Sequence, residues 1–470
     1  MISAVPAPRL FAYASAAILA ASLAYGLLHM PLQFHDALDE MMAAQRSPSL
    51  RASFTSTFGE TSYFRLLRIT ETKFFFDVSG GHYFASYKAF HIAVVAAAFV
   101  LLTGYLRVAT GIDLAAALFA LSVFTGLHTL VPIVKEAYPV NHYLQIMVFS
   151  LAAAHVARSR GGWWIDAAAI VMYIAGSLLL ESGVLIWVVI AASRLLGRRG
   201  VSDRAIALMT LLLAGYLFVR FVWLLPNLRA MGNASGYFFE RLEVAQIRER
   251  FGPGLTRFNV YNVLASIASV LFSEPRAGVF LFAKAWSMGD VPPRMWISIA
   301  SSAITTALIG VAVWRRWVNR TMDDGSTDLA LFMAVLCANA VASYAYTKDD
   351  IISVAGAFYA VAAFWAVRDL LSRPHRVVAS VVLGAALLIA GSGWSIRTVG
   401  VNYLLRTQAF AIRNDWAWVP DEMQRHGTWP TEPSTQRFVI GLRDSALAMP
   451  VVNPWFVPRW MDRVFDVDYF

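Results

Sequence analysis

Apolar blocks of about 20 residues recur along this chain and constrain its fold more than any other feature. A helix needs about 20 apolar residues to cross ~30 Å of hydrocarbon. Only 15% of the residues are charged, whereas 58% are hydrophobic. Because helices pair their own backbone groups inside lipid, the blocks predict an all-α polytopic membrane protein. About eleven spans are expected, at 10–30, 89–106, 112–133, 141–157, 163–180, 183–197, 204–225, 296–314, 327–345, 351–369 and 376–394.

The short loops between these spans carry arginine mainly on one side. Thirteen arginines fall in the loops of one side, whereas the short loops of the other carry only Lys135 and Lys348. Cytoplasmic loops are enriched in Lys and Arg, so this bias predicts a cytoplasmic N-terminus and, with eleven spans, an outer C-terminus. The thirteen are Arg107, Arg158, Arg160, Arg194, Arg198, Arg199, Arg204, Arg315, Arg316, Arg320, Arg368, Arg373 and Arg376.

Three longer segments are then expected on the outer side. They are residues 31–88, 226–295 and 395–470, so the chain divides into a transmembrane domain at 1–394 and a short outer-face segment at 395–470. Within 226–295, two short apolar runs flank Pro275 and predict a re-entrant or surface-lying hairpin. The tryptophans of the last segment suit a bilayer interface.

Several functional classes lack their signatures. The single cysteine, Cys337, lies in an apolar block, so a disulfide framework and a thiolate metal cluster are both excluded. The sequence has no phosphate loop, zinc-binding HExxH helix or GxSxG nucleophile turn. The net charge of +9 comes without a basic stripe interleaved with aromatic residues, so nucleic acid is not an expected partner.

An acidic stretch directly follows the first span. Asp36, Asp39 and Glu40 would share one side of a short helix, since residues three and four apart lie one turn apart. Partial desolvation at the membrane surface raises the pKa of such carboxyls towards the range of a general base. The alternative to a functional role is that these acids lie in the solvated first turn of a helix, where acidic residues are tolerated. Asp36 and Asp39 are also candidate ligands for a divalent cation such as Mg²⁺ or Mn²⁺.

Further ionisable residues gather on the same predicted outer side. Arg65 and Arg68, amid aromatic residues, suit a lipid phosphate or pyrophosphate, although anchoring in lipid headgroups explains each equally well. A histidine within a span, such as His128, is a functional candidate or a buried group hydrogen-bonded between helices. The full set adds Lys348, and His91, Glu136 and Glu181 as supporting groups.

These pieces resemble, in order, the GT-C class of membrane glycosyltransferases, especially bacterial relatives of the protein O-mannosyltransferases. The FHDA sequence at 34–37 resembles an F-x-D-D motif after the first span, with alanine replacing the second acid. The RLL sequence at 65–67 resembles an R-P-L motif, and YKAFH at 87–91 resembles a Y-H-x-x-N motif. The ESG sequence at 181–183 resembles a K-E pair, and 346–350 occupies the place of a charged outer turn.

The resemblance implies an inverting glycosyltransferase in a bacterial inner membrane, with its active face to the periplasm. A sugar would pass from a polyprenyl-phosphate or pyrophosphate carrier to a lipid, glycan or protein acceptor. Asp36 would be the base, and Asp39 or Glu40 would orient the acceptor or a metal. Arg65, Arg68 and Lys348 would hold the departing phosphate.

Three other functions remain open. A transporter or flippase for a lipid-linked saccharide would also place arginine and aromatic groups near the interface, but it predicts polar cavity groups on both sides of the membrane. A polymerase or ligase would use the same donor, with functional arginines in a large late outer loop such as 226–295. A non-catalytic subunit of an envelope polysaccharide system would explain the incomplete motifs.

Overall fold

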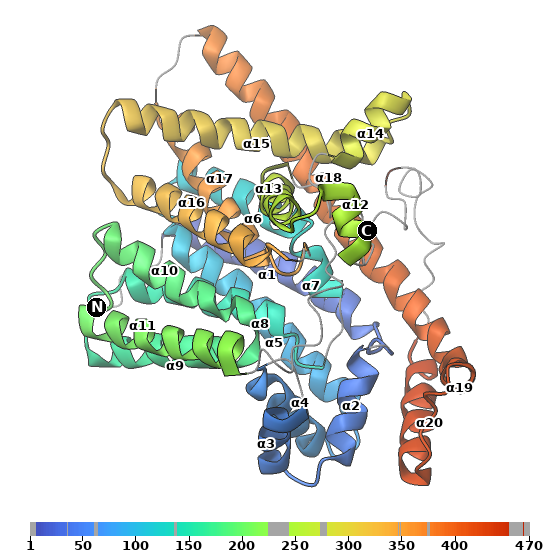
Figure 1. Ribbon diagram of the computed structural model, residues 1–470. Coiled ribbons are helices and arrows are strands. Elements are labelled where there is room, and N and C mark those ends of the chain that lie inside the picture. Colours follow the sequence, from blue (N-terminus) through green and yellow to red (C-terminus); the bar gives the residue numbers. More distant parts are fainter. Residues whose placement is uncertain are drawn as a thin grey trace.

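The chain folds entirely into helices over the residues that the structure describes (Figure 1). The structure is a computed structural model that describes residues 6–34, 36–60, 64–135, 139–223, 244–272, 280–345, 347, 349–373, 377–450 and 464. Its first half contains α1 (Ala7–Leu28), α2 (Asp36–Arg46), α3 (Leu50–Glu60), α4 (Leu66–Val78), α5 (Tyr83–Leu106), α6 (Gly111–Gly126), α7 (Val131–Lys135), α8 (His142–Ala157), α9 (Trp163–Leu179), η1 (Glu181–Gly183), α10 (Val184–Leu195), α11 (Asp203–Phe218) and the π-helix η2 (Val219–Trp223). Its second half contains α12 (Val244–Phe251), α13 (Thr256–Phe272), α14 (Phe280–Met288), α15 (Pro293–Val318), α16 (Asp324–Ala342), α17 (Ser353–Leu371), α18 (Val377–Asp415), η5 (Trp416–Trp418), α19 (Val419–Arg425) and α20 (Pro433–Leu447).

A helix lies at each of the eleven predicted positions, although not all are long enough to span. Among the described residues, six helical segments are long and apolar enough to cross a membrane: α1, α5, α15, α16, α17 and the segment that begins with α18. The number becomes seven if α12 and α13, bent by 78°, form one broken span. The protein is therefore helical and compatible with a multi-pass membrane protein. The break predicted at Pro275 lies outside the described residues.

Two predicted blocks differ from the observed helices, whereas the fifth and sixth match theirs closely. The block at 112–133 is interrupted, because α6 ends at Gly126 and α7 begins only at Val131. Pro132 explains this break, since proline has no N–H for the carbonyl of His128 and its ring clashes there. The fifth and sixth blocks form a tight hairpin in which a Cβ on Gly183 would overlap the backbone of Gly176. The last block continues as α18 to Asp415, so residue 394 lies inside a helix.

The core surrounds α17, which is buried along nearly its whole length. It packs on α6, α8, α15 and α16, and seven of its nineteen residues are alanine or glycine, which let helix backbones approach closely. Gly356 is one such point, because a Cβ there would overlap the side chain of Thr129. By contrast, the apolar face of α18 is largely uncovered by protein, as expected for a lipid-facing helix.

A buried aspartate of α16 connects this helix to four other segments at the arginine-rich end of the bundle. Asp328, on α16, is 1% exposed and accepts hydrogen bonds from Arg158 Nη2 at 2.8 Å, Tyr105 Oη at 2.6 Å and Trp365 Nε1 at 2.8 Å. Arg198 also pairs with it. The Arg158 guanidinium lies over the Tyr105 ring, 4.4 Å from its centre. These contacts hold the loops after α8 and α10 against α5, α16 and α17.

Other arginines of this end are paired in the same way. Arg368 Nε donates to Asp113 Oδ1 at 2.6 Å, and Arg316 pairs with both Asp323 and Asp369. The sequence predicts only that such arginines set the orientation of the chain in the membrane. The structure gives several of them a second role as partners of buried acids.

Replacing Asp328 with asparagine should destabilise the protein by about 3 kcal/mol, because two buried guanidiniums lose their shared counter-charge. The measurement is the unfolding of the detergent-solubilised protein as SDS is added to mixed micelles. Asp324→Asn is the matched control, since the Asp324 side chain is 57% exposed, and it should cost less than about 1 kcal/mol. Equal losses in the two variants would contradict a special role for Asp328.

Candidate functional site

The predicted acidic stretch forms the start of α2. Asp36 and Asp39 occupy its first turn, where negative charge favours the helix dipole, while Ala37 and Leu38 are buried. The helix itself matches the expectation from the sequence, but the three acids do not share one environment, because Glu40 pairs with Arg68 of α4 whereas Asp36 and Asp39 are exposed. Neither exposed carboxylate therefore has the desolvated environment that was expected. Ala37 is 0% exposed, so a second acid at this position would be buried in the core.

The third acid of the stretch pairs with one of the predicted phosphate-binding residues. Glu40 forms an ion pair with Arg68, and both side chains are largely buried, at 17% and 11% exposure. This pair joins α2 to α4, which also pack directly on each other. Arg68 thus has a carboxylate partner within the protein.

Arg65 is paired as well, with a carboxylate 116 positions away in the chain. Its Nη2 and Nε lie 2.8 Å and 3.2 Å from Glu181 Oε2, and Arg220 Nη2 lies 3.2 Å from Glu181 Oε1. Burial alone would raise the pKa of Glu181, but Arg65 and Arg220 outweigh it and hold that pKa below its usual value. Arg220 is supplied by the π-helix η2, a rare element that often marks functional segments. Sequence reasoning did not identify Arg220.

A second partly buried carboxyl lies on α4. Glu71 Oε2 accepts a hydrogen bond from Gln145 Nε2 at 2.9 Å, which connects α4 to the start of α8. Burial raises the pKa of Glu71 to about 7, against the smaller opposing effect of the Gln145 hydrogen bond. The pKa of Glu71 thus lies near neutral pH.

The two predicted histidines occupy buried positions apart from α2. Asn141 Nδ2 lies 2.8 Å from His91 Nε2, and Asn141 caps α8 in a left-handed conformation with φ 38°. His128 Nε2 lies 2.8 Å from Ser269 Oγ and 3.5 Å from Asp349 Oδ1. Both histidines thus connect elements of the bundle, which fits the structural alternative. Lys348 and Glu136 lie outside the described residues.

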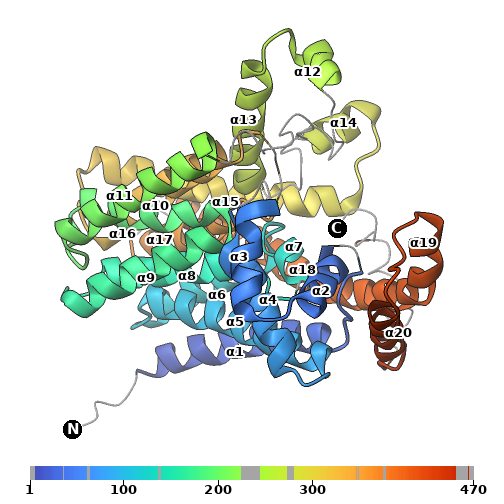
Figure 2. The same cartoon turned by 60° about the horizontal axis from the view of Figure 1, so that its bottom comes forward.

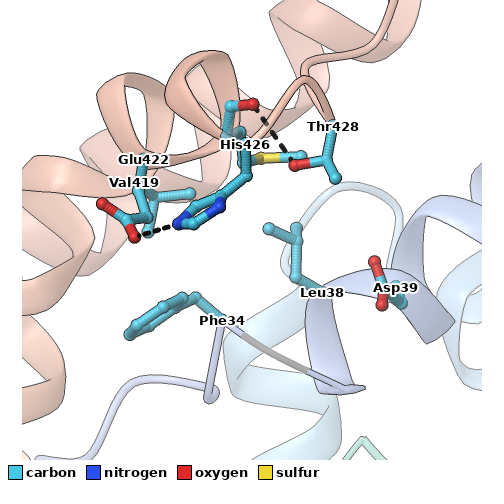
Figure 3. Close-up of a pocket in the computed structure, with 8 residues that line it drawn as sticks. Phe34, Leu38, Asp39, Val419, Glu422, His426 and Thr428 are labelled. Carbon is cyan, nitrogen blue, oxygen red and sulfur yellow. Dashed lines mark hydrogen bonds and ion pairs between the residues drawn. The ribbon is translucent and has the colours of Figure 1, made fainter.

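A cavity of about 370 Å³ lies between α2 and α19, and we call it the α2–α19 cavity (Figure 3). It has a size typical of small-molecule sites, ~300–1,000 Å³. Of the predicted site residues, Asp39 lines it, whereas Asp36 and Arg65 do not. The lining residues are Phe34, Leu38, Asp39, Val419, Glu422, Met423, His426 and Thr428.

The C-terminal wall of this cavity was not predicted. His426 Nε2 lies 2.8 Å from Glu422 Oε1, one turn earlier on α19 (Figure 3). The wall is held in place by Trp416, whose buried Nε1 donates to the carbonyl of Leu32 at 2.7 Å. Only a prediction of contact between residues nearly 400 positions apart would have identified His426.

A metal site is not evident in the described part of the chain, which contains no group of three or more His, Cys, Asp or Glu residues arranged to hold an ion. The predicted use of Asp36 and Asp39 for Mg²⁺ or Mn²⁺ stays a prediction. The two carboxylates alone would leave most of the ligands of such an ion to water.

The chain matches no family model, no curated protein and no solved structure. The GT-C resemblance therefore rests on the quoted sequence motifs alone.

Replacing Glu71 with glutamine should change how stability depends on pH. A folded Glu71 keeps its proton up to about pH 7, whereas an unfolded glutamate loses it near 4.5, so the folded state binds more protons between these values. The wild-type protein should therefore lose about 2–3 kcal/mol of stability as pH rises from 4.5 to above 7, and Glu71→Gln should not. Thermal unfolding at pH 5 and pH 8 measures the difference. Glu249→Gln, at an exposed position on α12, should behave as wild type.

Proposed function

We propose that this protein is a membrane glycosyltransferase that moves a sugar from a polyprenyl-phosphate-linked donor to an acceptor on the non-cytoplasmic side of a bacterial inner membrane. The helical bundle supports an integral membrane protein, and the arginine bias supports the orientation. In Figure 2, α2, α19 and α20 gather at one end of the molecule, which would be the outer end.

The observation that carries this proposal is the α2–α19 cavity and the carboxylate of Asp39 on its wall. Transfer needs a pocket for an acceptor hydroxyl, a base for its proton and cations for the leaving phosphate. The α2–α19 cavity provides the pocket, and Asp39 provides the base. The cations of Arg65 and Arg68 belong to α4, which packs on the same helix α2.

The reaction we propose is a single inverting displacement. The acceptor oxygen forms a bond to the anomeric carbon, its proton passes to a carboxylate, and the polyprenyl phosphate leaves with the electrons of the broken C–O bond. The phosphate is a good leaving group and needs no acid. The sequence assigns the base to Asp36, whereas the cavity favours Asp39, one turn later on α2.

One observation favours a second candidate, a non-catalytic subunit of an envelope polysaccharide system. Arg65 and Arg68 each have a carboxylate partner, Glu181 and Glu40. A lipid phosphate would have to compete with these carboxylates, so the same ion pairs also suit a purely structural role.

Membranes that contain the full chain should transfer radiolabel from defined polyprenyl-phosphate sugars to an endogenous acceptor. Asp39→Asn, which preserves shape and removes basicity, should lower the rate by about 100-fold or more at normal expression. Asp421→Asn, an exposed acid of α19 outside the cavity lining, should leave the rate unchanged.

Asp36→Asn distinguishes the two candidate bases in the same assay. A loss of transfer in Asp36→Asn alone would return the base to Asp36. Unchanged transfer in both variants would remove α2 from the chemistry. Absence of transfer by the wild-type chain with every donor would favour the non-catalytic subunit.

A further inference from the structure

The lining of the α2–α19 cavity combines apolar and hydrogen-bonding side chains. Phe34 and Leu38 from the N-terminal part, with Val419 and Met423 from α19, give an apolar surface. Asp39, Glu422, His426 and Thr428 add hydrogen-bonding groups around it. In Figure 3 the His426 ring faces the space above Phe34 and Leu38, with Asp39 on the far side of Leu38.

The charge of the described lining is acidic. It includes Asp39 and Glu422 and no lysine or arginine. Arg425 pairs with Glu422 Oε2 at 3.2 Å, but it does not line the cavity and its side chain is 66% exposed. An anion placed in this space would lie close to two carboxylates, which is unfavourable because like charges repel.

We propose that the α2–α19 cavity binds the acceptor through neutral sugar hydroxyls, so that the acceptor is a glycan or a glycolipid headgroup. The inference rests on the proposed function and names the substrate class of its site. It also separates the site into two parts, because the phosphate of the donor is excluded from this cavity and must lie on the side of α2 that faces the arginines of α4.

The polar groups match a polyhydroxylated ligand in number and kind. Carboxylates of Asp39 and Glu422 accept hydrogen bonds from hydroxyls, and charge-assisted bonds of this type are stronger than neutral ones. When His426 Nε2–H donates to Glu422, its Nδ1 is an acceptor for a further hydroxyl. The C–H face of a sugar ring can pack on Phe34, whose ring face carries partial negative charge.

The test is ligand binding by the full chain in nanodiscs, followed by saturation-transfer NMR. The probes are glucose, maltose and diacetylchitobiose as neutral saccharides, with glucuronate and inorganic phosphate as anions. Neutral saccharides should bind, and glucuronate, which differs from glucose only at C6, should bind at least about tenfold more weakly. Glu422→Gln and His426→Gln should each raise the Kd for maltose about tenfold, the effect of losing one charge-assisted hydrogen bond.

Asp421→Asn is the matched control and should retain the wild-type Kd. Thr428→Val, which removes one hydroxyl at nearly constant volume, gives a second readout should a charge change perturb α19, and it should raise the Kd by a smaller factor. The proposal is overturned by equal binding of glucuronate and glucose, by wild-type affinity in all three cavity variants, or by no binding of any neutral saccharide. The binding assay contains no sugar donor, so its result does not depend on transfer activity. A failure of saccharide binding can therefore be distinguished from a failure of transfer.

Discussion

Backbone hydrogen bonding in an apolar medium constrains everything else in this molecule. A segment surrounded by hydrocarbon must pair its own N–H and C=O groups, so the apolar blocks become helices and ionisable side chains concentrate at helix ends. The arginine-rich end shows this concentration of charge, because Asp328 forms ion pairs there with the nearly buried side chains of Arg158 and Arg198. The opposite end carries α2 to α4 and the C-terminal helices α19 and α20.

The cavity beside α2 depends on α18 continuing beyond its apolar run. No proline interrupts the chain from 377 to 415, so the helix continues through polar sequence to Asp415 and brings Trp416 to the carbonyl of Leu32. Arg413 then donates to the carbonyls of Leu447 and Met449 and fixes the end of α20. The wall formed by α19 is therefore positioned from two sides.

Local patterns predicted the helices, because a helix depends on the spacing of residues within one segment. The same patterns could not show that Arg65 meets Glu181 or that Arg68 meets Glu40, since these contacts depend on how distant helices pack. The main error at Asp36 concerned its exposure to solvent. Its position directly after a span suggested a desolvated carboxylate, yet Asp36 lies on the solvent-exposed side of α2. His426 had no sequence signal, because its significance comes from proximity to α2 alone.

Charge is distributed unevenly around α2 in the candidate site. On one side, the arginines of α4 meet carboxylates from α2 and η1; on the other, the α2–α19 cavity carries Asp39 and Glu422 and no described cation. A donor with a phosphate and an acceptor with hydroxyls would be attracted to different faces of such a helix. Glu181 and Glu40 then fulfil a further requirement, since buried or half-buried guanidiniums need an anion whenever no phosphate is present. The ion pairs that weaken the simplest phosphate-site interpretation are thus also what a resting enzyme of this kind would need.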